Sequence, residues 1–523
     1  MDFKTKLLNY FNINDEQYKE LTKPIEEIIL PSYNNFNDMK KATEIIKNAM
    51  ANNDKIVIYG DYDCDGIMST SIMVKCFNML NYRIGYYIPS RYIDGYGLNA
   101  KRVQDFYDKG YKLIITVDNG IAQFEAIQKA YDLGIKVIVT DHHERQEILP
   151  DVEAILHPII SNYGNVVCCG AYVAFMLASS LLNKYDEYLL SLASMATISD
   201  MMPLVSYNRD IVRLGIYYMN KNNYYSIRLL SEESIIDENV IGLKMAPKIN
   251  AIGRMIENTS INVLVEYFTT QNKERIDLIY NFINETNEKR KLLTRSSADK
   301  VHVEDNVHGI IAVTELKEGI IGLTANALMN KYNLPAIVLT KDHLDSNIYK
   351  GSARSKKGLA INKFFLENKD IFITSGGHEQ AGGLSLETKN IEDLRVRFEE
   401  YALNNPFIEE KEDYLDISIT DINKDNYNFI RTLSPFGEGF KLPLLKISNI
   451  KVSNLAYSKS KLHILYPLSV NQKIIGFNYS KELLNNYDYI NIFGSLGYSS
   501  FNGKESFDFN IKRITDKDDC IIN

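Results

Sequence analysis

Three short acidic segments, each directly after a run of apolar β-type residues, constrain the fold of this chain more than any other feature. The segments are Asp61–Gly66, Asp118–Gly120 and Asp141–His143. The runs before them cover residues 56–59, 113–117 and 136–140, with helical stretches between them. This pattern predicts buried parallel strands in an α/β sheet. Because ligands of open α/β sheets bind beyond the carboxyl ends of the strands, we expect the three segments to meet in one crevice.

The side chains of these segments are the donors that a pair of divalent cations needs. Two cations about 3.5–4 Å apart stabilise the attacking and the leaving oxygen of a phosphoryl displacement. The carboxylate and imidazole donors are Asp61, Asp63, Asp65, Asp118 and His142. Asp200 is a sixth candidate because it ends a further apolar stretch, where a charge without a partner would be costly to bury. The sequence therefore predicts a two-metal centre, with water rather than a side chain as the nucleophile.

Each segment taken alone is also typical of simpler structures. Acidic residues after strands often serve only as helix caps or turns, and an isolated His-His pair is more often structural. A calcium-binding loop that started at Asp61 would carry Glu at its twelfth position, but Ile72 stands there. Three such segments in succession, each after a strand, favour the metal centre over caps, turns or a calcium loop.

These motifs resemble those of the DHH phosphoesterase superfamily, and segments further along the chain resemble its RecJ branch. The DHH motifs match at Asp61–Gly66, Asp118–Gly120, Asp141–His143 and Asp200. The segments similar to the RecJ branch are Pro247–Met255, Gly351–Ser355, Ser375–Gly383 and Pro435–Gly439. One departure is Tyr59, which stands where the wider superfamily often has His, so no metal role is expected for this residue.

The resemblance implies an α/β fold of several domains. The expected parts are a DHH domain with a parallel sheet, a long connecting helix, a second α/β domain (DHHA1, the DHH-associated domain) and a C-terminal OB-like β-barrel. The expected bounds are 1–44 for an N-terminal helical cap on the first domain, 45–256 for the DHH catalytic domain, 257–305 for the connecting helices, 306–405 for DHHA1 and 413–515 for the OB-fold-like domain. Short strands separated by Asn and Ser turns after residue 413 favour the last assignment.

The implied activity is that of a metal-dependent 5′→3′ exonuclease, which hydrolyses single-stranded DNA to mononucleotides in DNA recombination and repair. The expected cofactors are two divalent metal ions, Mn²⁺ or Mg²⁺, because carboxylates suit both and imidazole favours Mn²⁺. Two alternatives stay open: an oligoribonucleotide or cyclic-dinucleotide phosphodiesterase, and a non-catalytic DNA-binding scaffold. RNA digestion also stays open.

Within this resemblance the residues of the centre receive expected roles. The expected metal ligands are Asp63, Asp65, Asp118, His142 and Asp200. Asp118 and Asp200 are the expected bridges, because two metals must share a ligand. Asp61 and His143 are the expected catalytic residues: Asp61 ligates or holds a water, and His143 faces the scissile phosphate, where an imidazolium stabilises developing charge.

A second group of residues is expected to bind the DNA strand. The candidates are Arg91, Asn250, Arg254, Ser352, Arg354, Gly376, Gly377 and His378. By resemblance, the three arginines and Ser352 would clamp the 5′-terminal phosphate and so set the polarity of digestion. The Gly-Gly-His segment would offer backbone N–H groups to a second phosphate. Its structural alternative is a tight strand–helix turn.

The charge and cysteine content bound the remaining expectations. Lys+Arg 59 against Asp+Glu 67 gives a net charge of −8, so DNA binding would need a local basic channel rather than a basic chain. Five cysteines without Cys-x-x-Cys spacing indicate a reducing compartment. Neither a signal peptide nor an apolar run of eighteen residues is present. We therefore expect a cytoplasmic monomer that does not contact membranes, with single-stranded DNA, single-strand-binding protein and a helicase as candidate partners.

Overall fold

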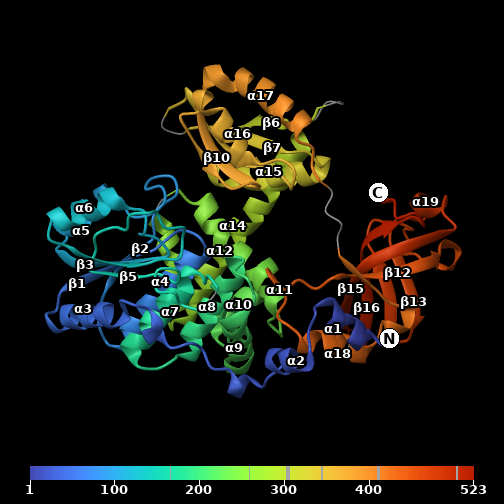
Figure 1. Ribbon diagram of the computed structural model, residues 1–523, viewed down its shortest axis with the longest axis horizontal. Coiled ribbons are helices and arrows are strands. Elements are labelled where there is room, and N and C mark those ends of the chain that lie inside the picture. The colour runs from blue at the N-terminus through green and yellow to red at the C-terminus, as the bar shows by residue number, and fades with distance from the viewer. Residues whose placement is uncertain are drawn as a thin grey trace. The chain divides into compact units, whose positions relative to one another are not determined.

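The computed structural model of the chain forms two compact units, Leu30–Glu410 and Met1–Ile29 with Lys411–Asn523 (Figure 1). The structure describes residues 1–164, 166–257, 259–301, 307–342, 345–408, 413–501 and 504–522. No helix among these residues is both long enough and apolar enough to cross a membrane.

A five-stranded parallel sheet organises the first part of the larger unit. Its strands are β1 (Lys55–Tyr59), β2 (Gly85–Tyr87), β3 (Tyr111–Val117), β4 (Lys136–Thr140) and β5 (Ala154–Leu156), in the order β2-β1-β3-β4-β5. From β1 the chain passes to β2, which lies on one side of β1. It then returns to β3, which lies on the other side of β1. This reversal opens a crevice at the carboxyl ends of β1 and β3. The predicted parallel strands are confirmed, and the three acidic segments follow the adjacent strands β1, β3 and β4.

Helices cover both faces of this sheet, as its alternating side chains require. Val57 and Ile114 pack with the buried residues of α5 (Ala100–Asp108) and α6 (Phe124–Asp132) on one face. The helices around the other face are α3 (Met39–Ala51), α4 (Cys64–Met79), α7 (Gly170–Leu182) and α8 (Glu187–Ser199). Helices α4 and α7 are buried over most of their length, and the sequence of α7 is nearly continuously apolar.

Further helices lead from the DHH domain toward the second α/β domain. They are α9 (Ser206–Asn222), α10 (Tyr225–Ser231), α11 (Glu238–Val240), the π-helical turn η3 (Ile241–Met245), α12 (Ala246–Met255), α13 (Val263–Thr269) and α14 (Lys273–Lys300). Helix α14 is the long connecting helix that the sequence predicts. It has 28 residues.

The second α/β domain is a mixed five-stranded sheet with helices on both faces. Its strands are β6 (Ile310–Thr314), β7 (Ala336–Lys341), β8 (Ile348–Arg354), β9 (Thr374–Gly377) and β10 (Ala381–Glu387), in the order β6-β7-β8-β10-β9. Strands β6 and β7 are parallel, and the other neighbours are antiparallel. Helices α16 (Ile361–Glu367) and α17 (Ile391–Asn404) share one hydrophobic core with β7, β8 and β10. Helix α15 (Glu318–Tyr332) packs with β6, β7 and the end of α14 in a separate core.

The smaller unit contains a six-stranded sheet in the order β11-β12-β15-β16-β14-β13. Its strands are β11 (Tyr414–Asp416), β12 (Leu444–Lys451), β13 (Ile464–Ser469), β14 (Gln472–Gly476), β15 (Tyr489–Phe501) and β16 (Lys504–Thr515). Helices α18 (Lys424–Thr432) and α19 (Lys481–Leu484) complete the part that follows the larger unit.

The first helices of the chain belong to this smaller unit. Helices α1 (Phe3–Tyr10) and α2 (Asp15–Leu21) lie before residue 29, and Phe3 and Leu7 are buried in the core of the six-stranded sheet. Phe11 stacks on Phe440, with ring centres 4.5 Å apart. The expectation that residues 1–44 form one cap on the DHH domain is therefore wrong for residues 1–29. Phe3 and Leu7 are apolar residues that need a core, but the sequence of the helix does not specify which core buries them.

We predict that Leu7→Ala destabilises the smaller unit by about 2–5 kcal/mol, because truncation of a fully buried Leu leaves a cavity. Amide hydrogen exchange on the full chain should rise in β12, β15 and β16 and stay unchanged in β1 and β3. Leu278→Ala on α14 is the control, because Leu278 is 63% exposed. An equal rise of amide exchange in the strands of both units after Leu7→Ala would contradict this assignment of α1.

Candidate active site

The first acidic segment turns directly from β1 into helix α4. The Asp63 carboxylate caps this helix by accepting a hydrogen bond from Gly66 N at 3.0 Å. A side chain at Gly66 would overlap the backbone of Asp61, so glycine is needed for this tight return. The Asp65 carboxylate accepts hydrogen bonds from Gly170 N and Ala171 N, both at 2.7 Å. Asp65 therefore fixes the N-terminus of α7 next to that of α4.

The second segment places Asp118 at the end of β3 in a left-handed conformation, with φ of 62°. The next residue, Asn119, donates from Nδ2 to Gly60 O at 3.1 Å and to Val117 O at 2.9 Å, so it ties the end of β3 to the end of β1. A Cβ atom at Gly170 would lie 2.5 Å from Asp118 Oδ1. Only glycine at position 170 leaves room for this carboxylate.

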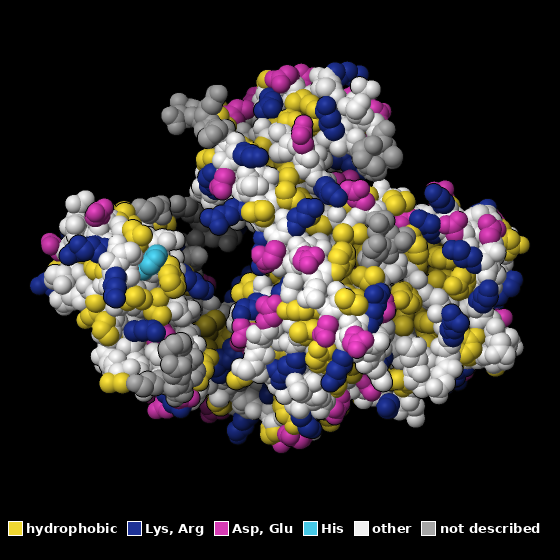
Figure 2. Space-filling model, turned by 180° about the vertical axis from the view of Figure 1, so that it is seen from behind, with side chains coloured by type: hydrophobic (Ala, Val, Ile, Leu, Met, Phe, Trp, Pro, Cys, Tyr) yellow, Lys and Arg dark blue, Asp and Glu magenta, His cyan; other side chains and the backbone are white. Residues whose placement is uncertain are grey.

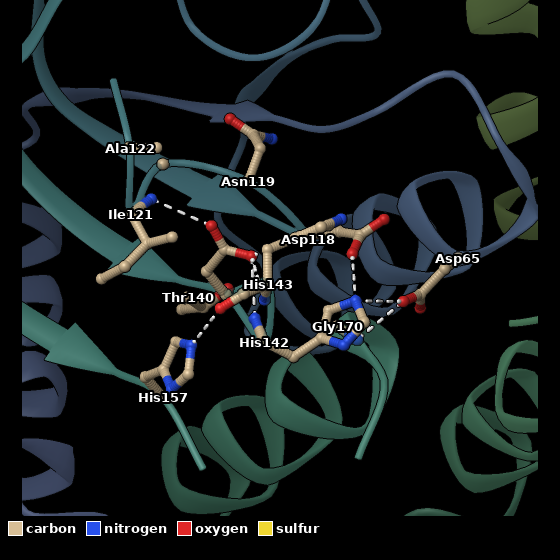
Figure 3. Close-up of polar contacts among 12 residues, drawn as sticks. Asp65, Asp118, Asn119, Ile121, Ala122, Thr140, His142, His143, His157 and Gly170 are labelled. Carbon is tan, nitrogen blue, oxygen red and sulfur yellow. Dashed lines mark hydrogen bonds and ion pairs between the residues drawn. The ribbon is translucent and has the colours of Figure 1, made fainter. Parts of the chain in front are cut away.

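The third segment is organised by Asp141, which sequence reasoning did not include among the site residues. Its Oδ1 accepts hydrogen bonds from His142 N at 2.8 Å, His143 N at 3.1 Å and His143 Nδ1 at 2.7 Å. Its Oδ2 accepts from Ile121 N at 2.9 Å (Figure 3). Burial alone would raise the pKa of Asp141, but these hydrogen bonds outweigh it and hold the pKa below its ordinary value. Asp141 thus orients both histidines.

His143 is fixed on three sides. Burial lowers its pKa, but the bond to Asp141 and the nearby carboxylates raise the pKa to about 9. Its carbonyl accepts a hydrogen bond from His157 Nε2 at 2.8 Å (Figure 3), and His157 Nδ1 accepts from Ile159 N at 3.2 Å. His143 Nε2 lies 3.0 Å from the hydroxyl of Tyr96. With Nδ1 bound to Asp141, Nε2 would have to exchange its contact with the Tyr96 hydroxyl in order to act on a substrate.

The predicted ligands come together around His142. Its Nε2 lies 3.1 Å from Asp118 Oδ1 and 3.5 Å from Asp65 Oδ2 (Figure 3). Asp200 Oδ2 lies 3.6 Å from the same nitrogen. Three groups of donor atoms lie close enough together to hold a metal ion. They are Asp118, His142 and His143; Asp65, His142 and Asp200; and Asp61, Asp63 and Asp118. Asp118 and His142 each belong to two groups, whereas Asp200 belongs to one, which favours Asp118 over Asp200 as a bridging ligand.

Several carboxylate oxygens of this cluster accept no hydrogen bond, which fits divalent cations. Asp61 Oδ1, Asp118 Oδ1 and Asp200 Oδ2 are buried, and none of them accepts a hydrogen bond from the described residues. Burial, and then the charges of the neighbouring carboxylates, raise the pKa of Asp61 and of Asp200 to about 8 and that of Asp118 well above its ordinary value. A buried acidic cluster of this kind is unfavourable alone, and cations would offset the repulsion.

Helix α12 docks directly on the first acidic segment. Asn250 Oδ1 accepts a hydrogen bond from Cys64 N at 2.8 Å. Gly253 packs so closely on the carbonyl of Tyr62 that any side chain at 253 would overlap it. These two contacts place Arg254 beside the acidic segment. In this structure Asn250 supports the segment, and a contact between Asn250 and DNA stays a prediction.

The predicted phosphate clamp is assembled from both α/β domains along one helix. Gly319 and Gly322, one turn apart on α15, pack against the backbone of Arg254 and against the side chains of Ser352 and Arg354. Arg354 Nη1 donates to Ser352 Oγ at 2.9 Å.

Tyr92 adds a further contact to this junction between the two α/β domains. Its hydroxyl donates to Arg254 O at 2.6 Å and accepts from Gly319 N at 3.3 Å. The contact joins the loop after β2, helix α12 and helix α15.

Arginine side chains gather at this junction. Burial, and then the charges of Arg91, Arg290 and Arg354, lower the pKa of Arg254 to about 10. The guanidinium carbon of Arg91 lies 4.3 Å from the ring centre of Tyr62. Sequence reasoning missed Arg290 because it lies on α14 among other charged residues, with no motif to distinguish it.

The Gly-Gly-His segment lies in the second sheet at the same register as Ser352 of the predicted clamp. Gly376 pairs with Gly383, which pairs with Ser352 on its other side. Gly376 and Gly377 belong to the exposed edge strand β9, and His378 N donates to Ala381 O at 2.8 Å. The segment is thus part of a β-hairpin rather than a strand–helix turn. Its contact with phosphate stays a prediction.

Three known domain families match this chain, in the same order as the three domains described above. Residues 55–199 match the DHH family N-terminal domain, residues 306–404 the DHHA1 domain and residues 415–513 the RecJ OB domain. A protein of Bacillus subtilis named single-stranded-DNA-specific exonuclease RecJ is 32% identical over 494 residues, which are 91% of this chain and 63% of the relative. The chain therefore carries the DHH, DHHA1 and RecJ OB domains and is similar to this RecJ protein over most of its own length.

Other RecJ proteins are similar over most of their own length. The Haemophilus influenzae protein of the same name is 26% identical over 89% of this chain and 88% of the relative. A crystal structure of RecJ from Thermus thermophilus in complex with Mn²⁺ superimposes with a TM-score of 0.84, at 21% identity, over 98% of this chain and 75% of that chain. The structural likeness supports the fold, including the DHH, DHHA1 and OB domains.

The acidic cluster predicts an unusual stability effect of Asp118→Asn. Because the folded state raises the pKa of Asp118, the folded state binds this proton more tightly than the unfolded chain does, and stability falls as pH rises through the raised pKa. Asp61 and Asp200, whose pKa values in the folded state are about 8, lower the stability in the same direction between about pH 4 and about pH 8. In a chelator, Asp118→Asn should therefore melt at a higher temperature than wild type at pH 8, with a smaller difference at pH 5.

Added Mn²⁺ should raise the melting temperature of wild type far more than that of Asp118→Asn, because a ligand that binds only the folded state stabilises it. Asp151→Asn, which removes an exposed carboxylate, is the control for charge alone. A variant that melts below wild type in chelator at pH 8 would contradict the repulsion described for this cluster.

Proposed function

We propose that this protein is a metal-dependent 5′→3′ exonuclease that hydrolyses single-stranded DNA to mononucleotides. The observation that carries the proposal is that one loop, residues 61–66, holds both parts of the reaction. Its carboxylates belong to the metal-ligating groups, and its backbone carries α12 and thereby Arg254. The phosphate clamp and the hydrolytic centre are thus held at a fixed separation.

The proposed cofactors are two divalent ions, Mn²⁺ or Mg²⁺, which would polarise the scissile phosphate and activate water when bound. Asp61, Asp63 and Asp118 would hold one ion. Asp65, His142 and Asp200 would hold the other, and Asp118 is the proposed bridge. The mixed carboxylate and imidazole set suits Mn²⁺. RecJ structures from relatives contain Mn²⁺ or Mg²⁺, which supports this choice.

The clamp residues would bind the 5′-terminal phosphate and so select the end that is digested. Arg91, Arg254 and Arg354 would each offer N–H donors to phosphate oxygens, and Ser352 would add a hydroxyl. A terminal phosphate carries more negative charge than an internal diester, so gathered guanidinium groups favour the end of a strand over its interior. Lys and Arg are interspersed with Asp and Glu over the face seen in Figure 2. A local clamp therefore accounts for DNA binding at a net charge of −8.

His143 would stabilise the scissile phosphate during hydrolysis. Asp141 holds its Nδ1 and His157 holds its backbone carbonyl, so Nε2 can donate to a phosphate oxygen. The OB domain would bind the strand beyond the cleaved nucleotides, as this fold does elsewhere through stacking and backbone contacts. A role in recombination and repair follows from this substrate. Contacts with single-strand-binding protein and a helicase stay predictions.

Two other functions use part of the same machinery. A phosphodiesterase for dinucleotides would need the metal centre but not the OB domain, and a scaffold would need neither the clamp nor a full ligand set. In this chain the metal-ligating groups, the clamp and the OB domain occur together, which favours the exonuclease.

The polarity of digestion tests the proposal. With Mn²⁺, a long single strand that carries a 5′ phosphate should lose mononucleotides from its 5′ end, while a label at its 3′ end stays on long products until late. Asp118→Ala should reduce hydrolysis by at least about 10³-fold and keep DNA binding, because it removes the proposed bridge. Release from the 3′ end, preference for dinucleotides, or full activity of Asp118→Ala would contradict the proposal.

A further inference from the structure

We propose that Tyr62 is a positioning residue that holds Arg91 in place for the 5′ phosphate and so couples recognition of the strand end to the metal centre. This inference rests on the proposed exonuclease function. Tyr62 lies between Asp61 and Asp63 in the loop that supplies metal donors. Its ring and its backbone contact different parts of the clamp.

The ring of Tyr62 is the surface on which Arg91 lies. The guanidinium carbon lies 4.3 Å from the ring centre, well inside the distance of about 6 Å at which a cation is attracted to an aromatic face. Within the described residues, the Arg91 guanidinium makes no hydrogen bond or ion pair, and its Nε is buried. The ring therefore holds the charge without using any N–H donor. The donors on Nη1 and Nη2 are used by none of the described residues and stay available for an anion.

The backbone of Tyr62 carries the other half of the clamp. Gly253 packs on its carbonyl, and Arg254 follows Gly253 in the chain. Two arginines from distant parts of the sequence are thus placed relative to the same residue. That residue is flanked on both sides by carboxylates of the metal-ligating groups. A phosphate held by these arginines would take a defined position relative to the hydrolytic centre.

Loss of the ring should affect one step selectively. Arginine has several rotatable bonds, so without an aromatic surface Arg91 would spend much of its time away from the phosphate site. Binding of a 5′ phosphate would weaken. A strand with a 5′ hydroxyl offers Arg91 no terminal phosphate, so its slower hydrolysis would fall less than that of the phosphorylated strand. A residue that only supports the loop would affect both strands alike.

The test compares Tyr62→Leu, Tyr62→Phe and wild type on two single strands that differ only in a 5′ phosphate or a 5′ hydroxyl, with Mn²⁺. We expect wild type to prefer the phosphorylated strand in kcat/KM. Tyr62→Leu should reduce this preference about tenfold, the size expected for a desolvated cation–aromatic contact. Tyr62→Phe should keep it, because the ring remains. In Tyr62→Leu, hydrolysis of the hydroxyl strand should fall less than hydrolysis of the phosphorylated strand.

Two further variants sharpen the comparison. In an Arg91→Ala background, Tyr62→Leu should cause no further loss of preference, because the two residues act through one contact. Tyr131→Leu on α6 is the matched control, because Tyr131 is 71% exposed and should leave both rates unchanged.

Several results would overturn the inference. They are an equal loss on both strands, an equal loss for Tyr62→Leu and Tyr62→Phe, an additional loss in the Arg91→Ala background, or an unchanged preference in Tyr62→Leu. A wild-type enzyme that digests from the 5′ end without any preference for phosphate would reject the clamp alone. Digestion from the 3′ end, or none, would reject the proposed function itself.

Discussion

The repulsion among buried carboxylates at the ends of β1 and β3 is the constraint on which the rest of the structure depends. Asp61, Asp65 and Asp118 are almost fully buried, and such a cluster persists only where other groups offset its charge. Part of the compensation is built into the fold. Asp63 caps α4, and Asp65 accepts hydrogen bonds at the start of α7, where the helix dipole favours negative charge. The carboxylate oxygens that accept no hydrogen bond account for the demand for cations.

The same constraint explains why small residues recur around the site. Gly66, Gly170 and Gly253 each lie where a side chain would overlap a residue of the acidic cluster or its loop. Gly319 then allows α15 to approach α12. Close backbone packing therefore extends from the metal loop to the second α/β domain. The proposed arginine clamp can be placed accurately only if this packing is rigid, and the packing would in this way link end recognition to hydrolysis.

Much of the fold and of the site could be predicted from the sequence because both depend on short-range patterns. Apolar runs followed by Asp predicted β1, β3 and β4. Because ligands bind beyond the carboxyl ends of parallel strands, Asp118 and His142 were expected to lie close together. The partner of α1 could not be predicted, since an amphipathic stripe does not name its core. Arg290 could not be predicted either, because it matters only through its nearness to Arg254, which is far away in the sequence.

Asp141 could have been found from the sequence, because an acidic residue before two histidines is well placed to orient them. Tyr62 could not, since its value lies in the arginine that folding brings onto its ring.

Anomalous diffraction at the manganese edge, from crystals grown with Mn²⁺ and a short 5′-phosphorylated strand, tests the central claim most directly. The account predicts two manganese peaks about 3.5–4 Å apart with Asp118 between them, and the terminal phosphate in contact with Arg91 and Arg254. A single peak away from Asp118, or a 5′ phosphate bound elsewhere, would contradict it.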